Sequence, residues 1–157
     1  MPEQPDTTAI RGYCIRLLAR REHSRYELLT KCLAKRFPRN LIDVVLDELS
    51  QRDWQDDARY AEVFARQRIQ KGYGPLAIRA ELQQRGLALD DLDVLLATLV
   101  SNWQDVIERV YYAKYKQPPD NTQEKAKRFR FLQQRGFTPT QIQTLFKQHL
   151  HYSPTDY

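Results

Sequence analysis

The stretch LQQRG at residues 82–86 recurs letter for letter at residues 132–136, fifty positions later. The same ungapped shift also superposes apolar positions around these segments and extends into the first part of the chain. The superposed sets are Cys32, Leu82 and Leu132; Phe37, Leu87 and Phe137; Ile42, Leu92 and Ile142; and Val45, Leu95 and Leu145. A fixed period of this length is typical of a repeat protein. The sequence therefore predicts three tandem copies of one unit.

Each copy carries apolar residues at the spacing of an amphipathic helix. In residues 39–51 they form one stripe, made of Leu41, Ile42, Val45, Leu46 and Leu49. The predicted helices are 10–21, 25–35 and 39–51 in the first copy, 57–71, 75–85 and 90–99 in the second, and 103–115, 123–135 and 139–149 in the third. We expect an all-α protein of three tandem three-helix repeats. Because a unit of about fifty residues buries a limited core, we also expect stacking into an elongated, curved array.

The predicted boundaries follow the repeat period. They are a disordered N-terminal tail at 1–9, repeats at 10–52, 53–102 and 103–150, and a C-terminal tail at 151–157. Two helix starts carry the pattern of a capping box, in which a hydroxyl and a Glu or Gln three residues later each accept a backbone N–H. These are Ser24 with Glu27, and Thr138 with Gln141.

The ends of the second helices contain a glycine in two of the three copies. Gly86 and Gly136 suit the left-handed residue that closes a helix, a conformation costing a residue with a side chain about 1 kcal/mol or more. The first copy has Arg36 at this position. We therefore expect that end to be built differently, with Pro38 stopping the helix.

The segment GYGP at residues 72–75 resembles a glycine-rich phosphate loop. It follows a predicted helix, however, and lacks the Lys-Ser/Thr pair of a nucleoside-triphosphate loop. Its first glycine can end a helix, its second lies at the repeat position of Ser24, and its proline suits a first helical residue. We interpret the segment as a turn between two helices. The N–H groups at the start of the second helix remain a candidate anion site beside Lys71 and Arg79.

The composition limits the classes of function. A net charge of +5 and a sequence pI near 9.3 are compatible with an anionic partner. The two cysteines, Cys14 and Cys32, form no Cys-x-x-Cys pair and are expected to be reduced thiols. The polar N-terminus does not resemble a signal peptide, and no apolar run approaches the ~20 residues of a membrane span. We expect a cytoplasmic protein.

No set of residues suggests catalysis or metal binding. The three histidines are scattered, and His149 and His151 do not share a helix face. The carboxylates near 56–57 and 90–91 begin predicted helices, where the helix dipole favours negative charge. We therefore predict a non-enzymatic protein without cofactor or metal, and we interpret Trp54 and Trp103 as packing residues at the repeat boundaries.

Basic residues interleaved with aromatic residues form the pattern with functional weight. A solvated helix face explains any one of them equally well, but together they can follow a phosphate backbone or an acidic protein groove. The candidate contact residues are Arg20, Arg21, Arg25, Arg68, Lys71, Arg79, Arg85, Lys127, Arg128, Arg130 and Arg135.

Several motifs in order resemble the RecX family of recombination regulators. They are LARREHSRYEL at 18–28, DARYA at 57–61, KGYGP at 71–75, IRAELQQRG at 78–86 and RGF at 135–137. The resemblance extends over residues 10–150. The departures are Arg36, where the other copies have glycine, and the first helix and following loop of the third copy.

The resemblance implies three three-helix repeats and a non-enzymatic modulator of the RecA recombinase, with roles in DNA recombination, DNA repair and the SOS response. Proteins similar to this one bind the groove of the RecA filament and suppress filament growth, ATP hydrolysis, strand exchange and co-protease activity. The implied partners are the RecA filament and single- and double-stranded DNA, without a membrane, and we expect a monomer.

Two other functions remain open from the residues alone. Three short helices with a tight turn also describe a helix-turn-helix regulator that reads DNA directly. The third helices offer little for base reading, since residues 92–100 contain one charged residue, Asp93. The second alternative is an inert helical scaffold.

Overall fold

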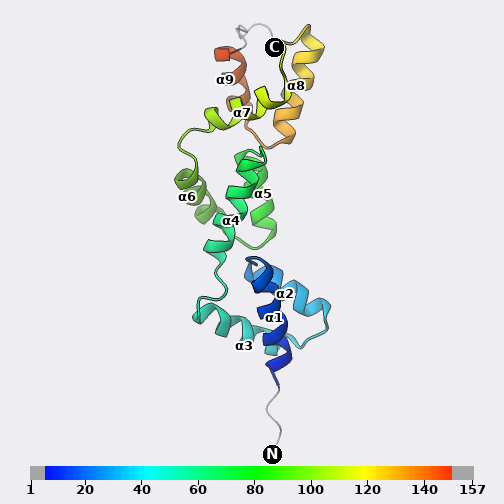
Figure 1. Ribbon diagram of the computed structural model, residues 1–157, viewed down its shortest axis with the longest axis vertical. Helices are drawn as coiled ribbons and strands as arrows, with labels where there is room; N and C mark the ends of the chain where they lie inside the picture. The colour runs from blue at the N-terminus through cyan, green and yellow to red at the C-terminus, as the bar shows by residue number, and fades with distance from the viewer. Residues whose placement is uncertain (1–5, 150–157) are drawn as a thin grey trace, which may run out of the picture. The chain divides into compact units, whose positions relative to one another are not determined.

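The computed structural model describes residues 6–149, which contain nine α-helices and no strand (Figure 1). The helices are α1 (Thr8–Arg20), α2 (Arg25–Ala34), α3 (Arg39–Gln51), α4 (Asp57–Gln70), α5 (Pro75–Gln84), α6 (Leu89–Leu99), α7 (Trp103–Lys114), α8 (Thr122–Gln134) and α9 (Pro139–His149). The all-α class is confirmed, and each helix boundary lies within two residues of its predicted position. None of these helices is long and apolar enough to cross a membrane. Of the predicted tails, residues 1–5 and 151–157 lie outside the described range.

The described chain forms two compact units. The first comprises residues 6–64 and 83–88, and the second comprises residues 65–82 and 89–149. The division runs through α4 and α5. The second repeat therefore does not make a unit of its own.

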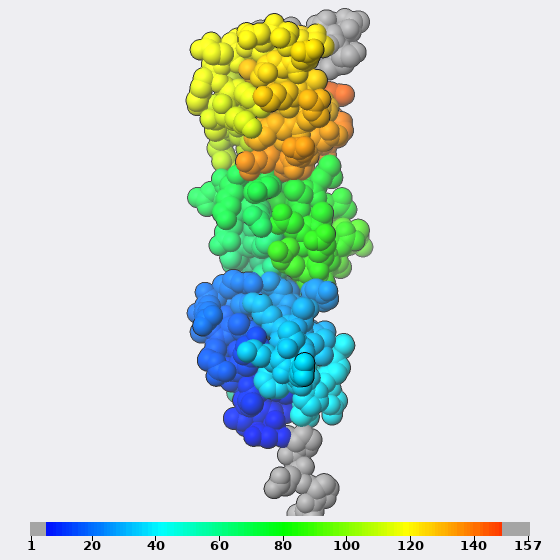
Figure 2. Space-filling view, turned by 90° about the vertical axis from the view of Figure 1, so that its right-hand side faces the viewer, coloured from blue at the N-terminus to red at the C-terminus, as the bar shows by residue number. Residues whose placement is uncertain are grey.

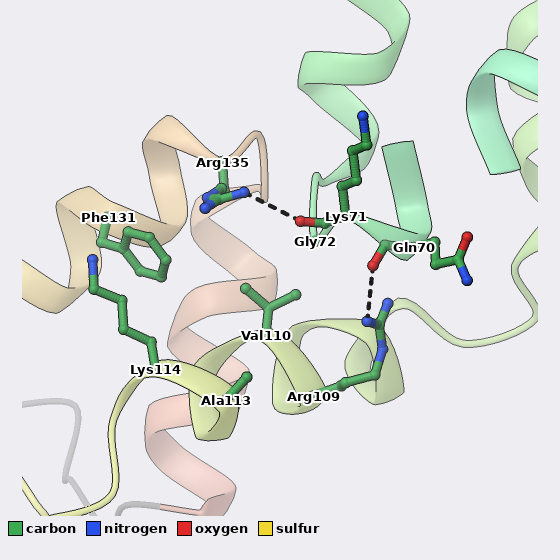
Figure 3. Close-up of a pocket in the computed structure, with 9 residues that line it drawn as sticks. All are labelled: Gln70, Lys71, Gly72, Arg109, Val110, Ala113, Lys114, Phe131 and Arg135. Carbon is green, nitrogen blue, oxygen red and sulfur yellow. Dashed lines mark hydrogen bonds between the residues drawn. The ribbon is translucent and has the colours of Figure 1, made fainter. Parts of the chain in front are cut away.

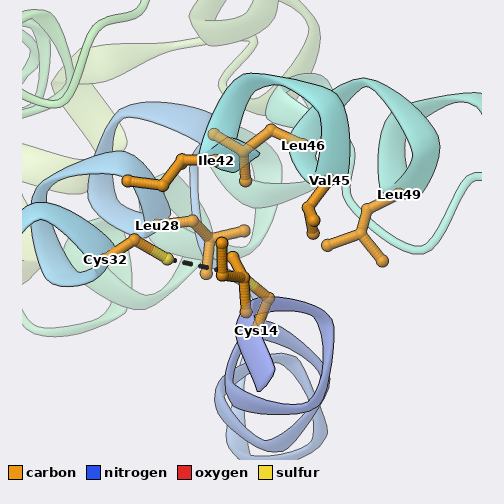
Figure 4. Close-up of a cluster of buried hydrophobic side chains, with 8 residues drawn as sticks. Cys14, Leu28, Cys32, Ile42, Val45, Leu46 and Leu49 are labelled. Atoms are coloured by element: carbon orange, nitrogen blue, oxygen red, sulfur yellow. Dashed lines mark hydrogen bonds between the residues drawn. The ribbon is translucent and has the colours of Figure 1, made fainter. Parts of the chain in front are cut away.

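The core of the first repeat gathers side chains from α1, α2 and α3 (Figure 4). Its fully buried members are Ile10, Cys14, Leu28, Cys32, Ile42, Val45, Leu46 and Leu49. The two cysteines are free thiols, as expected, and their Sγ atoms lie 3.5 Å apart. The hydrogen bond to Cys32 and burial raise the pKa of Cys14, so this thiol stays neutral in the core.

The core of the third repeat is rich in aromatic residues. Ile107, Val110, Tyr111, Leu132, Phe137, Ile142, Leu145 and Phe146 form its buried cluster. Trp103 packs edge-on against Phe137 at a centroid distance of 6.4 Å, which confirms its predicted packing role. The same interpretation is wrong for Trp54, whose side chain is 47% exposed and lies under the guanidinium of Arg52.

The predicted capping boxes are confirmed. Ser24 N–H donates to Glu27 Oε1 and Glu27 N–H donates to Ser24 Oγ, both at 3.1 Å. At the start of α9, Thr138 N–H donates to Gln141 Oε1 at 2.9 Å, and Gln141 N–H donates to Thr138 Oγ1 at 3.1 Å. These local patterns therefore fix two helix starts.

The end of α2 corrects one expectation. Arg36 has φ 64°, in the same left-handed region as Gly86 at 90° and Gly136 at 97°. The hydrogen bonding is repeated as well, since Phe37 N–H donates to the Cys32 carbonyl just as Phe137 N–H donates to the carbonyl of Leu132. The first copy thus closes its second helix in the same way as the others. An arginine holds a conformation that glycine adopts without cost.

Candidate anion-binding site

The turn between α4 and α5 lies against the end of α8. Gly74 N–H donates to the Arg135 carbonyl at 2.7 Å, and Leu76 N–H donates to the Gly136 carbonyl at 2.9 Å. In the space-filling view, the orange surface at the end of α8 lies directly against green surface of the second repeat (Figure 2). We call this arrangement the α5–α8 joint. Because protein carbonyls occupy these two N–H groups, the candidate anion site at the start of α5 is wrong, and the turn interpretation of GYGP holds.

The joint is too close for side chains at its two glycines. A Cβ placed on Gly74 would lie 2.5 Å from the carbonyl carbon of Gly136. A Cβ on Gly136 would lie 2.4 Å from the Cβ of Ala77. Glycine at both positions is what allows the two backbones to meet.

A cavity of about 280 Å³ opens beside the α5–α8 joint (Figure 3). Four basic residues line it: Lys71, Arg109, Lys114 and Arg135. Val110, Ala113 and Phe131 supply apolar surface, and the lining is completed by Gln70 and Gly72. No carboxylate lines the cavity. We call it the basic cavity.

Arg109 is held by the end of α4. Its Nη2 donates to the Ile69 carbonyl at 2.8 Å and its Nη1 to the Gln70 carbonyl at 3.3 Å. The last carbonyls of a helix have no partner within the helix and carry its partial negative charge. They orient the guanidinium but do not cancel its charge.

Arg135 and Lys114 also have neutral partners. Arg135 Nη1 donates to the Lys71 carbonyl at 3.3 Å, and its guanidinium lies over the rings of Tyr73 and Phe131 at 4.9 and 5.4 Å from their centroids. Lys114 Nζ lies 3.7 Å from the Phe131 centroid. Figure 3 shows Arg109, Lys114 and Arg135 around the cavity, whereas the Lys71 ammonium extends away from the other three. Since a guanidinium has five N–H donors, Arg135 keeps donors for a ligand.

Other basic candidates are paired inside the protein. Arg21 pairs with Glu27 at 3.0 Å and Arg25 with Asp47 at 2.8 Å. Two further pairs, each within its own repeat, are Arg68 with Glu81 at 2.9 Å and Arg79 with Asp93 at 3.0 Å. These four cations already have a carboxylate partner, so an external anion would have to compete for them.

Arg128 is a structural residue of the third repeat. Its side chain is buried, and Nη1 donates to the Tyr111 hydroxyl at 2.7 Å and to the Gln117 carbonyl at 2.8 Å. Its Nε donates to Glu124 at 3.2 Å. The guanidinium therefore links α7, the following loop and α8.

The remaining candidates are more accessible. Arg20, Lys127 and Arg130 are exposed and form no contact of their side chains with the rest of the described chain. Arg85 stacks over the Phe64 ring at 4.8 Å.

The sequence did not indicate two members of the basic cavity, Arg109 and Lys114. Both lie on α7, in the part of the third copy that follows the repeat pattern least well. The available signal was their charge alone. Their role depends on the carbonyls of α4 and the ring of Phe131, which only the folded chain brings beside them.

The fold and the cavity define a helical repeat protein with an uncompensated basic site. Family models for the first, second and third three-helix domains of RecX match residues 11–49, 56–93 and 104–146. The chain therefore belongs to the RecX family.

Relatives and solved structures agree with this assignment. Regulatory protein RecX of Pseudomonas syringae pv. tomato is 40% identical over 139 residues, covering 87% of this chain and 90% of the relative. Regulatory protein RecX of Pseudomonas entomophila is 41% identical over 135 residues, covering 85% and 87%. The crystal structure of RecX from Lactobacillus salivarius shares the fold, with a TM-score of 0.76 at 16% identity, covering 93% of this chain and 97% of the other.

Proposed function

We propose that this protein regulates the RecA recombinase by binding the RecA–DNA filament. In this proposal it acts as a monomer in the cytoplasm, by binding rather than by catalysis. It suppresses filament growth, ATP hydrolysis, strand exchange and co-protease activity. The observation that carries the proposal is membership of the RecX family, with relatives named regulatory protein RecX that align over 87% of the chain.

The distribution of unpaired charge suggests which residues make the contacts. Arg20, Lys127 and Arg130 are exposed without a carboxylate partner, and the basic cavity adds three further cations with neutral partners only. Uncompensated cations attract an anionic filament over roughly a Debye length, about 8 Å at physiological salt. Contacts spread over the repeats would reach adjacent RecA protomers and hinder the addition of new subunits.

The test is co-sedimentation with RecA filaments on single-stranded DNA, together with the rate of RecA ATP hydrolysis. We expect the protein to sediment with the filament and to lower the rate. A parallel salt titration measures its affinity for naked duplex DNA. Tight duplex binding without an effect on ATP hydrolysis would favour a direct DNA-binding regulator, and binding to neither would leave a scaffold. Either outcome overturns the proposal.

Two triple variants test the role of unpaired charge. Arg20, Lys127 and Arg130 are changed to Gln in one, and the paired residues Arg21, Arg25 and Arg79 are changed to Gln in the other. Both variants remove three positive charges. We expect the unpaired set to weaken inhibition about tenfold or more, and the paired set to weaken it far less. Equal losses would contradict the proposed contacts.

A further inference from the structure

The basic cavity has the features of a specific anion site, and we propose that it binds a phosphate group of the nucleic-acid backbone. The inference rests on the proposed function in one respect, namely that DNA in the filament supplies the phosphate. It goes beyond that function by assigning the contact to one cavity and to residues on α7 and α8.

The first observation is that the charge around the cavity is uncompensated. Arg109 and Arg135 donate to main-chain carbonyls, and Lys114 lies over a ring. None of these three forms an ion pair within the described chain. A ligand anion would therefore not have to displace a carboxylate, in contrast to the situation at Arg68 or Arg79.

The second observation is that the walls are fixed before any ligand arrives. The main-chain hydrogen bonds of the α5–α8 joint hold the end of α8 against the turn that follows α4. The carbonyls at the end of α4 orient Arg109, and the Lys71 carbonyl orients Arg135. Binding then requires little ordering of side chains, which favours affinity.

The third observation concerns the kind of anion. The carbonyls of Ile69, Gln70 and Lys71 already accept hydrogen bonds from the two arginines, so the cavity offers donors and few free acceptors. A phosphodiester only accepts hydrogen bonds and matches this surface. An acidic peptide would bring main-chain N–H groups that need acceptors of their own. The donor-rich lining thus favours a phosphate over a peptide carboxylate.

The size and the apolar surface also fit. A cavity of about 280 Å³ is at the lower limit for a small-molecule site, which suits a phosphate with its attached sugar better than a whole nucleotide. Val110 and Ala113 offer apolar surface to the carbons of a sugar. This arrangement favours backbone contact without base reading.

The experiment measures binding of a fluorescent single-stranded oligonucleotide to the full chain without RecA, by anisotropy over a salt series. The test variant is Arg109→Gln with Lys114→Gln. The matched control is Arg16→Gln with Lys147→Gln, which removes one arginine and one lysine from exposed positions without partners in the described chain. Circular dichroism checks that both variants fold.

We expect the cavity variant to bind about tenfold more weakly, while the control changes less than about twofold. Loss of one neutralised phosphate should also make the slope of log K against log salt shallower by about 0.7. Equal affinities for the cavity variant and the wild type, or equal losses in the cavity variant and the control, would overturn the inference.

The source of the phosphate is tested by competition. ATP and inorganic phosphate are added at millimolar concentration, and the amide signals of Gly72 and Gly136 are followed by NMR in the ¹⁵N-labelled protein. We expect the oligonucleotide to shift both signals, with ATP and inorganic phosphate competing weakly. Shifts with free ATP at far lower concentration than with the oligonucleotide would overturn the assignment to a nucleic-acid backbone.

The two proposals can fail separately. Inhibition of RecA without cavity-dependent oligonucleotide binding would reject the phosphate site alone. Cavity-dependent binding without any effect on RecA would reject the proposed function and leave the phosphate site standing, with its ligand supplied by other nucleic acid.

Discussion

The turns at Gly86 and Gly136 carry the same five letters and the same backbone conformation, yet they are constrained very differently. Gly136 is buried, and its carbonyl and that of Arg135 accept main-chain N–H groups of the second repeat. Gly86 is exposed, and the nearest atom to a Cβ placed there is the Tyr26 side chain at 2.9 Å. Identical sequence at a repeat position therefore does not imply an identical role.

The partner helices explain the difference. At the start of α2, Ser24 N–H is satisfied by Glu27 and Arg25 N–H by Asp57 at 2.8 Å, both through side chains. At the start of α5 the capping serine is replaced by Gly74, and the carbonyls of the α8 turn take over. The α5–α8 joint thus replaces a local cap by contacts between repeats. Substitutions at these turns measure how much each arrangement contributes.

The largest effect is expected for Gly136→Ala. The substitution combines a left-handed backbone, at about 1–2 kcal/mol, with overpacking against Ala77, at about 1–3 kcal/mol. We expect a loss of about 3 kcal/mol in the free energy of unfolding, measured by urea titration. Gly12→Ala is the control, because Gly12 lies inside α1 with room for a Cβ and should gain up to ~1 kcal/mol. Unchanged stability of the Gly136 variant would show that the joint is looser than its geometry.

The next effect is expected for Gly74→Ser. Comparison of the repeats alone would recommend serine, the residue at position 24, as the better helix cap by a few tenths of a kcal/mol. The structure predicts the opposite, a loss of about 2 kcal/mol, because a Cβ would contact the Gly136 backbone at 2.5 Å. Urea unfolding decides the sign. A stabilised variant would contradict the account of the joint given above.

Gly86→Ala should cost less, about 1–2 kcal/mol. The backbone strain is similar to that at Gly136, but the obstructing group is the side chain of the exposed Tyr26 rather than main chain. The double variant with Tyr26→Ala tests this reasoning. It should recover the steric part of the loss and leave the backbone part. No recovery would mean that the strain of the left-handed turn is the whole effect.

These cases show which features the sequence could predict. Helices, capping boxes and left-handed turns depend on residues a few positions apart, as in Ser24 with Glu27, and they were predicted correctly. The basic cavity depends on which repeat surfaces meet. Arg135 was a candidate by its charge, but its partner is a carbonyl at residue 71, and Arg109 reaches carbonyls of Ile69 and Gln70 on another repeat. Carbonyl acceptors have no sequence signature, so those contacts could not be predicted.

The smallest effect is expected at the third member of the set, Arg36, and its sign is opposite. Arg36 holds φ 64° at an exposed position, so glycine would relieve backbone strain of about 1 kcal/mol or more without losing a buried contact. The greater freedom of glycine in the unfolded chain offsets part of this gain. We expect Arg36→Gly to stabilise the protein by about 0.5 kcal/mol, measured by urea unfolding. Arg39→Gly, inside the first turn of α3, is the control and should lose stability because its backbone is helical. A loss at Arg36 as large as that at Arg39 would show that the arginine side chain contributes more to this turn than its exposure indicates.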